Sequence, residues 1–516
     1  MTIDSRLADA WARLPDYLGS HVLISITALA IGLGISLPLA ILSVRRPVLR
    51  GILLTAASIV QTIPGLALLA LFYPLLLALA ALSANLFGAN FSALGFLPSV
   101  LALALYSMLP VLRNTVTGLN GIDPRLREAA RLFGASPFAR MRDIELPLAM
   151  PVIMAGIRTS AVWVIGTATL STPIGQESLG NYIFAGLQTQ NWVFVAFGCV
   201  AAAALALVVD QLLALMEHGV VMHSRLRIAG GGAGLALVVL AALAPGYAGA
   251  RSSYVVGTEP FTEQYLLGAL MQQRMQGAGL SVSRRDGLGS ALIFSALTAG
   301  DIDVYVSYSG TIWATQMHHT DVKSRQEVLD AVSDWLTKTH GVRMLGSLGF
   351  EDAYALAMPR KKVNALGINS IADLAAHARQ LTIAGDYEFF ERPEWRALRD
   401  AYGLDFARRR TMQPDFMYQA AASGDVDVVS AYTSDGRVAK YDLKVLDDPK
   451  HAIPPYDAIL LITPKRAHDD KLAAALQPLV GTIGVETMRE ANLRASAGDV
   501  TTDAVAQWLW REIGKR

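Results

Sequence analysis

The chain is poor in cysteine and in charge, and both shortages limit what it can be. It contains one cysteine, Cys199, so no disulfide can form within the chain. Charged residues make up 17% of its 516 residues and apolar residues make up 53%, which is too apolar for an ordinary soluble globular protein. The formal net charge of +1 gives no reason to expect a nucleic acid as a partner.

Several catalytic motifs are also missing from the sequence. There is no G-x-x-x-x-G-K-[ST] loop, so the chain cannot hold ATP in the usual phosphate cradle. There is no G-x-S-x-G elbow, so nucleophilic hydrolase chemistry is unsupported. The segment with His318, His319 and Asp321 could suggest a metal site, but no full set of four ligands is apparent. Instead, we expect a solvated turn there. We therefore expect no catalytic residue, no cofactor and no metal site, and any ATPase must be a separate subunit.

Long apolar runs fill the first half of the sequence. Those long enough to cross roughly 30 Å of hydrocarbon cover residues 21–44, 51–82, 97–112, 150–170, 191–216 and 229–249. The second run contains Pro64 and Pro74, so we expect it to be kinked or broken. The third run is short and can be extended back over residues 86–96. Residues 1–20 are charged and lack a short apolar core, so we expect no cleavable signal peptide.

The arginines of the short loops indicate an orientation in the membrane. They are concentrated in residues 45–50, 113–143 and 225–227, whereas segments 83–96 and 171–190 hold a single charge, Glu177. Basic loops stay in the cytoplasm, so the N-terminus and residues 251–516 are expected outside. We predict a multi-pass protein of the plasma (inner) membrane, in contact with lipid, whose last span tethers an extracytoplasmic domain.

One cytoplasmic loop, at about residues 113–147, is too long and too patterned to be a mere connector. Its sequence predicts a helix over 124–133, with Asp123 as N-cap and Gly134 as the residue that ends it. A second helix is expected over 136–145, stopped by Pro147. On composition alone, such a loop can also be an amphipathic segment lying on lipid headgroups.

The motif residues of this loop resemble the coupling loop of ABC importer permeases. That loop has an E-A-A triplet, then a glycine, then I-x-L-P, and it docks in a groove of a cytoplasmic ATPase. The matching residues are Glu128, Ala129, Ala130, Gly134, Leu146 and Pro147. Residues 147–186 are similar to permeases of osmoprotectant importers, which carry glycine betaine, carnitine and choline. The same scaffold serves ergothioneine importers, which commonly fuse permease and binding domain.

The second half alternates short apolar strands with amphipathic helices, which favours parallel sheets covered by helices. Two segments echo each other: residues 296–308 read ALTAGDIDVYVSY and residues 420–432 read AAASGDVDVVSAY. This echo predicts two lobes built alike. Ligands of open α/β sheets bind beyond the carboxyl ends of strands, so Tyr308 and Tyr432 are expected to face one cleft from opposite sides.

Motifs in this half resemble those of osmoprotectant-binding domains. They are TEPFTEQY at 258–265, GDIDVYVSYSGT at 300–311, EDAYALAM at 351–358, E-F-x-x-R at 388–392, TSDGR at 433–437 and PPY at 454–456. The resemblance implies an aromatic cage of Tyr308, Tyr354, Tyr432 and Tyr456, with polar contacts from Thr311, Asp352 and Arg392.

The implied cage agrees with the physics of a quaternary ammonium. Such a group cannot donate a hydrogen bond, so a protein holds it with ring faces worth roughly 0.5–2 kcal/mol each. A ligand carboxylate would suit the guanidinium of Arg392. The sequence departs from the family at Glu259, where a lysine is usual, and at 306–307, where Val-Ser replaces Pro-Glu. The loss of the lysine leaves room for choline, carnitine, ergothioneine or another betaine.

The sequence therefore predicts a multi-domain chain: an all-α transmembrane permease followed by a two-lobed α/β domain like periplasmic binding proteins. Expected boundaries are 1–228 for the permease, 229–250 for the tether and 251–516 for the binding domain, with one lobe at about 251–355 and 457–516 and the other at 356–456. The predicted function is import of a quaternary ammonium compound by a permease homodimer with a separate ATPase. Alternatives are an ergothioneine importer, an amino-acid importer and a membrane-tethered sensor.

Overall fold

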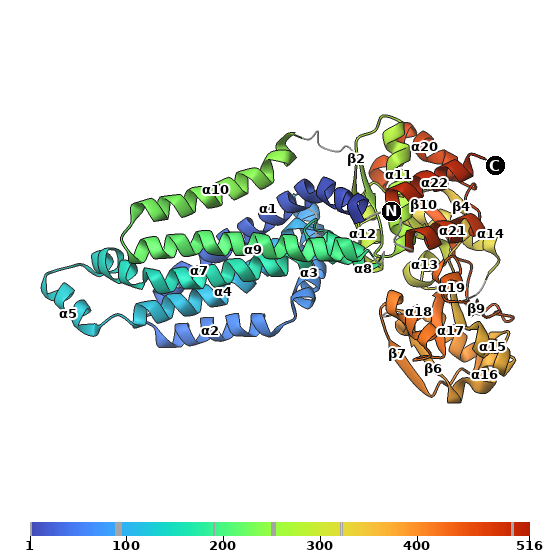
Figure 1. Cartoon of the computed structure of the whole chain (residues 1–516), viewed down its shortest axis with the longest axis horizontal. Helices are drawn as coiled ribbons and strands as arrows, with labels where there is room; N and C mark the ends of the chain where they lie inside the picture. Colours follow the sequence, from blue (N-terminus) through green and yellow to red (C-terminus); the bar gives the residue numbers. More distant parts are fainter. Residues whose placement is uncertain are drawn as a thin grey trace. The chain divides into compact units, whose positions relative to one another are not determined.

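The computed structural model describes residues 3–87, 95–188, 191–248, 254–319, 321, 323–386, 388–496 and 500–515. The chain divides into two compact units. One contains residues 7–184 and 193–250, and the other contains residues 251–516 together with 1–6 and 185–192. The first unit is helical and the second is α/β (Figure 1).

The helical unit is built from long apolar helices. They are α1 (Ile3–Ser43), α2 (Pro47–Thr62), α3 (Gly65–Phe87), α4 (Phe96–Asn120), α7 (Leu146–Ala168), α9 (Trp192–Val221) and α10 (Arg225–Ala248). In the described part of the chain, 5 continuous helices are long and apolar enough to cross a membrane, or up to 6 if α2 and α3 form one bent span. Each predicted apolar run overlaps one of these. Of the proposed extension over 86–96, residues 88–94 lie outside the described residues.

The break predicted in the second run is confirmed at Pro64. Helix α2 ends at Thr62 and α3 begins at Gly65, with a bend of 104° between them. Proline has no N–H and its ring clashes with the preceding turn, so a helix readily breaks there. Pro74, in contrast, lies inside α3.

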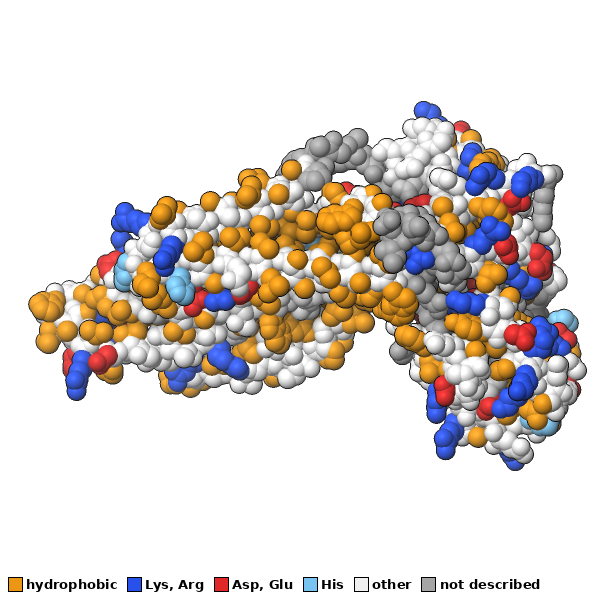
Figure 2. All heavy atoms as spheres, in the orientation of Figure 1, with side chains coloured by type: hydrophobic (Ala, Val, Ile, Leu, Met, Phe, Trp, Pro, Cys, Tyr) orange, Lys and Arg blue, Asp and Glu red, His pale blue; other side chains and the backbone are white. Residues whose placement is uncertain are grey.

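Small residues let the helices of this unit approach closely. A Cβ on Gly32 of α1 would lie 2.9 Å from the Ala104 carbonyl oxygen of α4, and one on Gly156 of α7 would lie 2.9 Å from the Pro110 carbonyl oxygen of α4. Close backbone contact supplies packing energy in lipid, where hydrophobic burial gives no advantage. On the visible face, hydrophobic side chains cover the helices, and Lys and Arg gather toward the end that carries α5 (Figure 2).

One charged cluster lies within these helices. Arg158 of α7 donates to Asp210 of α9 at 3.0 Å and to Glu217 of α9 at 2.7 Å. Charges within a membrane are costly unless they are paired, and here the guanidinium contacts a carboxylate on each side. The cluster joins α7 to α9. None of the sequence patterns described above predicts it.

The patterned loop folds largely as predicted. Helix α5 (Pro124–Leu132) begins after Asp123, whose side chain accepts from the Arg125 backbone N–H, and Gly134 follows it with a left-handed φ of +78°. The second helix was expected to stop at Pro147, and this is wrong. Helix α6 (Pro137–Arg140) passes through a π-turn, η1 (Met141–Glu145), directly into α7. In that turn the Leu146 N–H donates to the Met141 carbonyl five residues back, as in a π-helix. The next residue, Pro147, has no N–H that would need an acceptor.

The α/β unit contains two five-stranded sheets. The first has the order β2-β1-β3-β10-β4, with β1 (Tyr254–Gly257), β2 (Val282–Arg285), β3 (Val304–Tyr308), β4 (Arg343–Glu351) and β10 (Asp457–Ile462). The second has the order β7-β6-β8-β5-β9, with β5 (Tyr354–Pro359), β6 (Thr382–Gly385), β7 (Arg408–Thr411), β8 (Val428–Tyr432) and β9 (Leu443–Val445). Helices α11 (Thr262–Gly277), α12 (Ser290–Ala299), α17 (Pro393–Tyr402), α18 (Pro414–Ser423), α21 (Val485–Ser496) and α22 (Thr502–Ile513) belong to the same unit.

The sheets are mixed, so the expectation of parallel sheets is corrected. Strands β1, β2 and β3 run parallel, but β10 is antiparallel to β3 and β4. In the second sheet, β5 is antiparallel to β8 and β9. The chain passes from β4 in the first sheet to β5 in the second, and it returns from β9 in the second sheet to β10 in the first. Strands β5 and β10 therefore each enter their sheet from the other sheet. Parallel neighbours that follow each other in the chain need a crossover connection, usually a helix. A strand that arrives from the other sheet has no such connection to its neighbour and can pair with it antiparallel.

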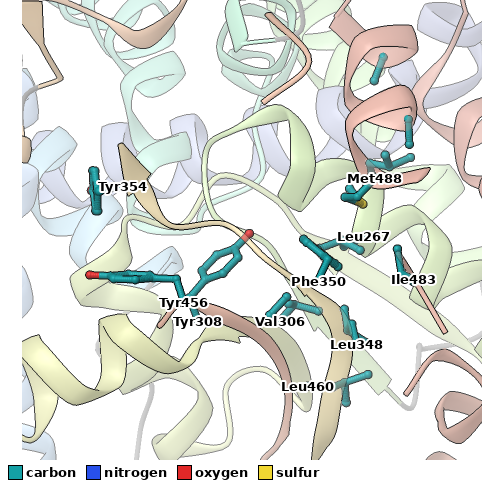
Figure 3. Packing of buried hydrophobic residues seen from close by; sticks show 14 of the residues in the cluster. Leu267, Val306, Tyr308, Leu348, Phe350, Tyr354, Tyr456, Leu460, Ile483 and Met488 are labelled. Atoms are coloured by element: carbon teal, nitrogen blue, oxygen red, sulfur yellow. The ribbon is translucent and has the colours of Figure 1, made fainter. Parts of the chain in front are cut away.

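The core of the unit continues up to the carboxyl ends of the first sheet. Val306, Leu348 and Leu460 come from neighbouring strands and are almost fully buried together. Tyr308 closes β3 and Tyr456 directly precedes β10, and both belong to the same buried cluster (Figure 3). The rigid aliphatic layer thus fixes the backbone from which these two rings project.

Candidate functional site

The structure brings all seven predicted ligand-binding residues to one cavity of about 230 Å³ in the α/β unit. They are Tyr308, Thr311, Asp352, Tyr354, Arg392, Tyr432 and Tyr456. The cavity is lined from both sheets, as expected for residues at the ends of strands that face one cleft.

The ends of strands place the four tyrosines. Tyr308 is the last residue of β3 and Tyr432 the last residue of β8, as the repeated sequence pattern predicts. Tyr354 opens β5 and pairs in register with Tyr432 on the adjacent strand. Tyr456 lies directly before β10, where the chain returns to the first sheet. Strand pairing therefore places the backbone positions of Tyr308, Tyr354 and Tyr432 at the cavity, and Tyr456 follows from its place next to β10.

Three of the rings pack against one another. The Tyr354 centroid lies 4.9 Å from that of Tyr432 and 5.9 Å from that of Tyr456, the latter pair at 86°. Tyr308 has a different aromatic neighbour, Phe261, with centroids 6.2 Å apart. Phe261 also lines the cavity and was not predicted, although it lies within the TEPFTEQY motif.

The hydroxyl groups of three cavity tyrosines donate to carboxylates. Tyr308 donates to Glu263 at 2.6 Å and Tyr432 donates to Asp386 at 2.6 Å. Tyr456 donates to Glu394. Burial raises the pKa of these three phenols well above the usual range, so the phenols stay protonated donors. A phenol that donates to an anion carries more negative charge on its ring, which strengthens attraction for a cation at the ring face.

Arg392 is already engaged by carboxylates. Its Nε and Nη2 donate to the two oxygens of Glu394 at 3.2 Å, and its Nη1 lies 3.4 Å from Glu388. The guanidinium carbon also lies 5.0 Å from the centroid of the Tyr354 ring. The fork that the sequence suggested for a ligand carboxylate is therefore filled from within the protein.

A hydroxyl joins two buried carboxyls at the cavity wall. Ser434 Oγ lies 2.6 Å from Asp352 Oδ1 and is also hydrogen-bonded to Glu263 Oε2. Asn492 donates to the same Glu263 oxygen at 2.7 Å. Of these residues only Asp352 was predicted. Glu263 and Ser434 stand in quoted motifs, but Asn492, on α21, carries no sequence signal.

Glu259, which replaces the usual lysine, lies in the wall of this cavity. Its side chain is 6% exposed and accepts from Ser290 Oγ at 2.9 Å. Burial raises the pKa of its carboxyl to about 7, and the nearby charge of Glu388 raises it as well. The position therefore offers an acceptor to the cavity in place of a cationic donor.

The patterned loop of the helical unit presents an exposed apolar face. Leu132, Phe133 and Phe138 are 85%, 91% and 73% exposed, beside an exposed Glu128 and a buried Ala130. Ala129 is half-buried, Gly134 is exposed, and Leu146 and Pro147 begin α7. The three apolar residues were not predicted to belong to the site.

A buried carboxylate joins the loop to the helices. Glu145 is 2% exposed and accepts from Arg140 at 2.7 Å. Arg45, between α1 and α2, and Arg127, on α5, lie 3.8 and 3.9 Å from the same oxygen. This ion cluster connects α5 to the π-turn that precedes α7.

Known proteins resemble both units. Residues 252–511 match the family model of the substrate-binding domain of ABC-type glycine betaine transport systems, and residues 30–221 match that of the inner-membrane component of binding-protein-dependent transport systems. The chain is 26% identical to an ergothioneine transport permease/ergothioneine binding protein of Helicobacter pylori, over 90% of this chain and 84% of that protein. It is 40% identical to a choline transport system permease protein of Bacillus subtilis, over 38% of this chain and 84% of that protein.

Among solved structures, a glycine betaine/carnitine/choline ABC transporter is 25% identical, with a TM-score of 0.45, over 50% of this chain and 98% of that chain. The two family models together assign the helical unit to a transporter's membrane component and the α/β unit to its binding component. The chain therefore belongs to the family of ABC-type glycine betaine transport system substrate-binding domains, here fused to the permease component of the same kind of importer.

Proposed function

We propose that residues 251–516 bind a quaternary ammonium compound outside the cell and deliver it to the permease helices of the same chain. The observation that carries the proposal is the cavity itself. Four tyrosines line it, and three of them donate their hydroxyls to carboxylates. Ring faces backed by anions suit a cation that has no hydrogen to donate. The names of the relatives, which include choline and ergothioneine transport, support the same class of ligand.

The patterned loop supports a division of labour in this function. We assign residues 1–228 to the permease, 229–250 to the tether and 251–516 to the binding domain. A separate ATPase would dock on the exposed face of α5 and the residues that follow it, where Leu132 and Phe133 offer apolar anchors. Two copies of the chain would enclose the path of the ligand in the inner membrane, with the binding domains outside.

An ergothioneine importer is the second candidate. The relative with that name is similar over 90% of this chain, whereas the choline permease is similar over 38%. Ergothioneine also carries a trimethylammonium group, so the tyrosines serve either ligand. The two candidate ligands differ outside the trimethylammonium group, so they differ in the groups that the rest of the cavity wall must contact.

A calorimetric titration of the purified chain tests the proposal. The panel contains glycine betaine, carnitine, choline, ergothioneine and methionine. At least one quaternary compound is expected to bind and methionine is not. Tyr432→Ala should weaken that binding, while Tyr441→Ala, a change of the same kind outside the cavity lining, should leave it unchanged. Binding of methionine alone would contradict the proposal.

A further inference from the structure

Two carboxyls in the cavity wall contact the same serine hydroxyl. A serine hydroxyl has one hydrogen and can donate it to one acceptor. Ser434 Oγ nevertheless lies within hydrogen-bond distance of both Asp352 Oδ1 and Glu263 Oε2. Two ionised carboxylates would leave one of these oxygen pairs without a hydrogen and in repulsion. A proton on one carboxyl, donated to the hydroxyl, removes this repulsion.

The surrounding donors decide which carboxyl holds it. Glu263 accepts from Tyr308 on one oxygen and from Asn492 on the other, in addition to Ser434. Three donors stabilise an anion. Among the described residues, the donors to Asp352 are the Ser434 backbone N–H, at 3.2 Å, and the shared hydroxyl. Burial raises the pKa of both carboxyls, but the donors around Glu263 oppose the rise there, whereas the charge of Glu263 raises the pKa of Asp352 further, which agrees with a proton on Asp352.

The other groups that face this pair favour the protonated form or are uncharged, because the negative charge of Asp435 raises the pKa of both carboxyls. From the second sheet, Asp435 lies behind Ser434 and is paired with Arg437 at 3.0 Å. From β3, the Tyr308 phenol stays protonated because burial raises its pKa well above the usual range. From α21, Asn492 is uncharged and holds its amide toward Glu263.

The rest of the cavity wall is also rich in acceptors. Glu259, Asp386 and Glu388 line it, and Asn492 Oδ1 is a buried acceptor without a partner in the described part of the chain. The two arginines that line it, Arg392 and Arg437, are each held by carboxylates. A ligand carboxylate entering this wall would meet anions and no unengaged guanidinium fork among the lining residues described.

We propose that the cavity binds a ligand of net positive charge in exchange for the proton that Asp352 and Glu263 share. The protonated domain and a cation go to the domain–cation complex and one free proton, so charge and atoms balance. The reason is electrostatic: a cation beside the pair favours two ionised carboxylates. This inference deepens the proposed function and rests on it, since it names a choline-like cation rather than a zwitterionic betaine.

Calorimetry of the full-length chain in detergent, at pH 6 in buffers of different ionisation enthalpy, counts the protons released per ligand. With choline as the probe, we expect release of about one proton and an affinity that rises up to about tenfold per pH unit until the pair ionises unaided. Glu259, whose pKa of about 7 leaves it protonated at this pH, is first replaced by glutamine. In that background Asp352→Asn places an amide where the acid proton was, and it should abolish both the release and the pH dependence.

A matched control removes a different cavity charge. Glu388→Gln takes one negative charge from the rim but leaves the shared proton, so it should weaken choline binding and keep the release. If Asp352→Asn does not fold, Glu263→Gln serves instead, because loss of the neighbouring charge should move the release to lower pH.

The outcomes separate the two claims. Choline binding without proton release, or equal release by Asp352→Asn, overturns the exchange. Binding of glycine betaine but not of choline overturns the requirement for net positive charge. If no quaternary compound binds at all, the proposed function itself fails.

Discussion

At the scale of single residues, the cavity combines rings with the carboxylates that hold them. Glu263, Asp386 and Glu394 each accept from one cage tyrosine, so these anions orient the rings and add charge behind them. The ring supplies most of the attraction for a cation, and the hydroxyl supplies its position. Loss of the ring and loss of the hydroxyl should therefore have different effects.

The first prediction separates these effects at Tyr432. Tyr432→Ala removes both ring and packing and should weaken binding of the quaternary ligand by about 1–3 kcal/mol. Tyr432→Phe keeps the ring face and should cost less, although Asp386 loses a donor. Calorimetry measures both. A larger loss for phenylalanine than for alanine would mean that the hydroxyl contacts the ligand.

The second prediction concerns Glu259, whose carboxyl ionises near pH 7 in the folded chain and near 4.5 when exposed. The folded state holds the proton more tightly, so this residue's contribution to stability is present below pH 4.5 and is lost as pH rises to about 7. The loss is at most about 3 kcal/mol. Glu259→Gln should raise the thermal midpoint more at pH 8 than at pH 5. An equal shift at both pH values would show that the carboxyl is not titrating.

Much of this site could be predicted from the sequence, and the reason is local. Tyr308 and Tyr432 end strands that follow a recognisable helix-Gly-Asp pattern, so their strand-end positions follow from a few residues. The engagement of Arg392 by Glu394 could not be predicted, since it depends on the turn before α17. The proton shared at Ser434 brings together residues from α11, the segment before β5 and the segment after β8, which only the fold places in contact.

At the scale of elements, the patterned loop has two parts. An ion cluster around Glu145 connects it to the helices, and exposed apolar side chains lie at and after the end of α5. Glu145 and its arginines form this connection, and Gly134 ends α5 so that the residues after it turn away. The cap and the glycine were predictable because each acts within one turn of helix. The continuation of α6 into α7 was not, because it depends on a π-turn before Pro147 that sequence spacing does not reveal.

The third prediction tests this loop. Gly134→Arg places a side chain at a φ of +78° on the exposed face that we propose for docking, and it should abolish uptake, with ligand binding unchanged. Gly367→Arg is the matched control, since Gly367 has a φ of +68° and, like Gly134, open space around its Cα. Uptake is compared at equal abundance of both variants. Normal uptake by Gly134→Arg would contradict the docking role.

At the scale of the whole molecule, the arrangement of charge along the sequence predicts the sidedness of the chain. The arginine-rich loops of the helical unit are expected on the cytoplasmic side, and the number of apolar helices then predicts where the C-terminal half emerges. Sequence reasoning found the apolar helices because apolar length is summed over many residues. It failed for strand direction, which depends on how the chain passes between the two sheets.

The fourth prediction follows from this sidedness. A tag on the N-terminus and a tag on the C-terminus should both be accessible to a membrane-impermeant reagent in intact cells. A tag inserted after Gly134 should be accessible only after permeabilisation. A C-terminal tag that is protected in intact cells would overturn both the topology and the proposed role of residues 251–516.

The central claim is that the cavity selects a trimethylammonium group, and one measurement addresses it directly. The dissociation constant of each quaternary ligand that binds is compared with that of the same molecule carrying a primary amine, such as choline with ethanolamine. Loss of three buried methyl groups and of a diffuse cation should weaken binding by about 2 kcal/mol, or roughly thirtyfold. Equal or tighter binding of the primary amine would contradict the account.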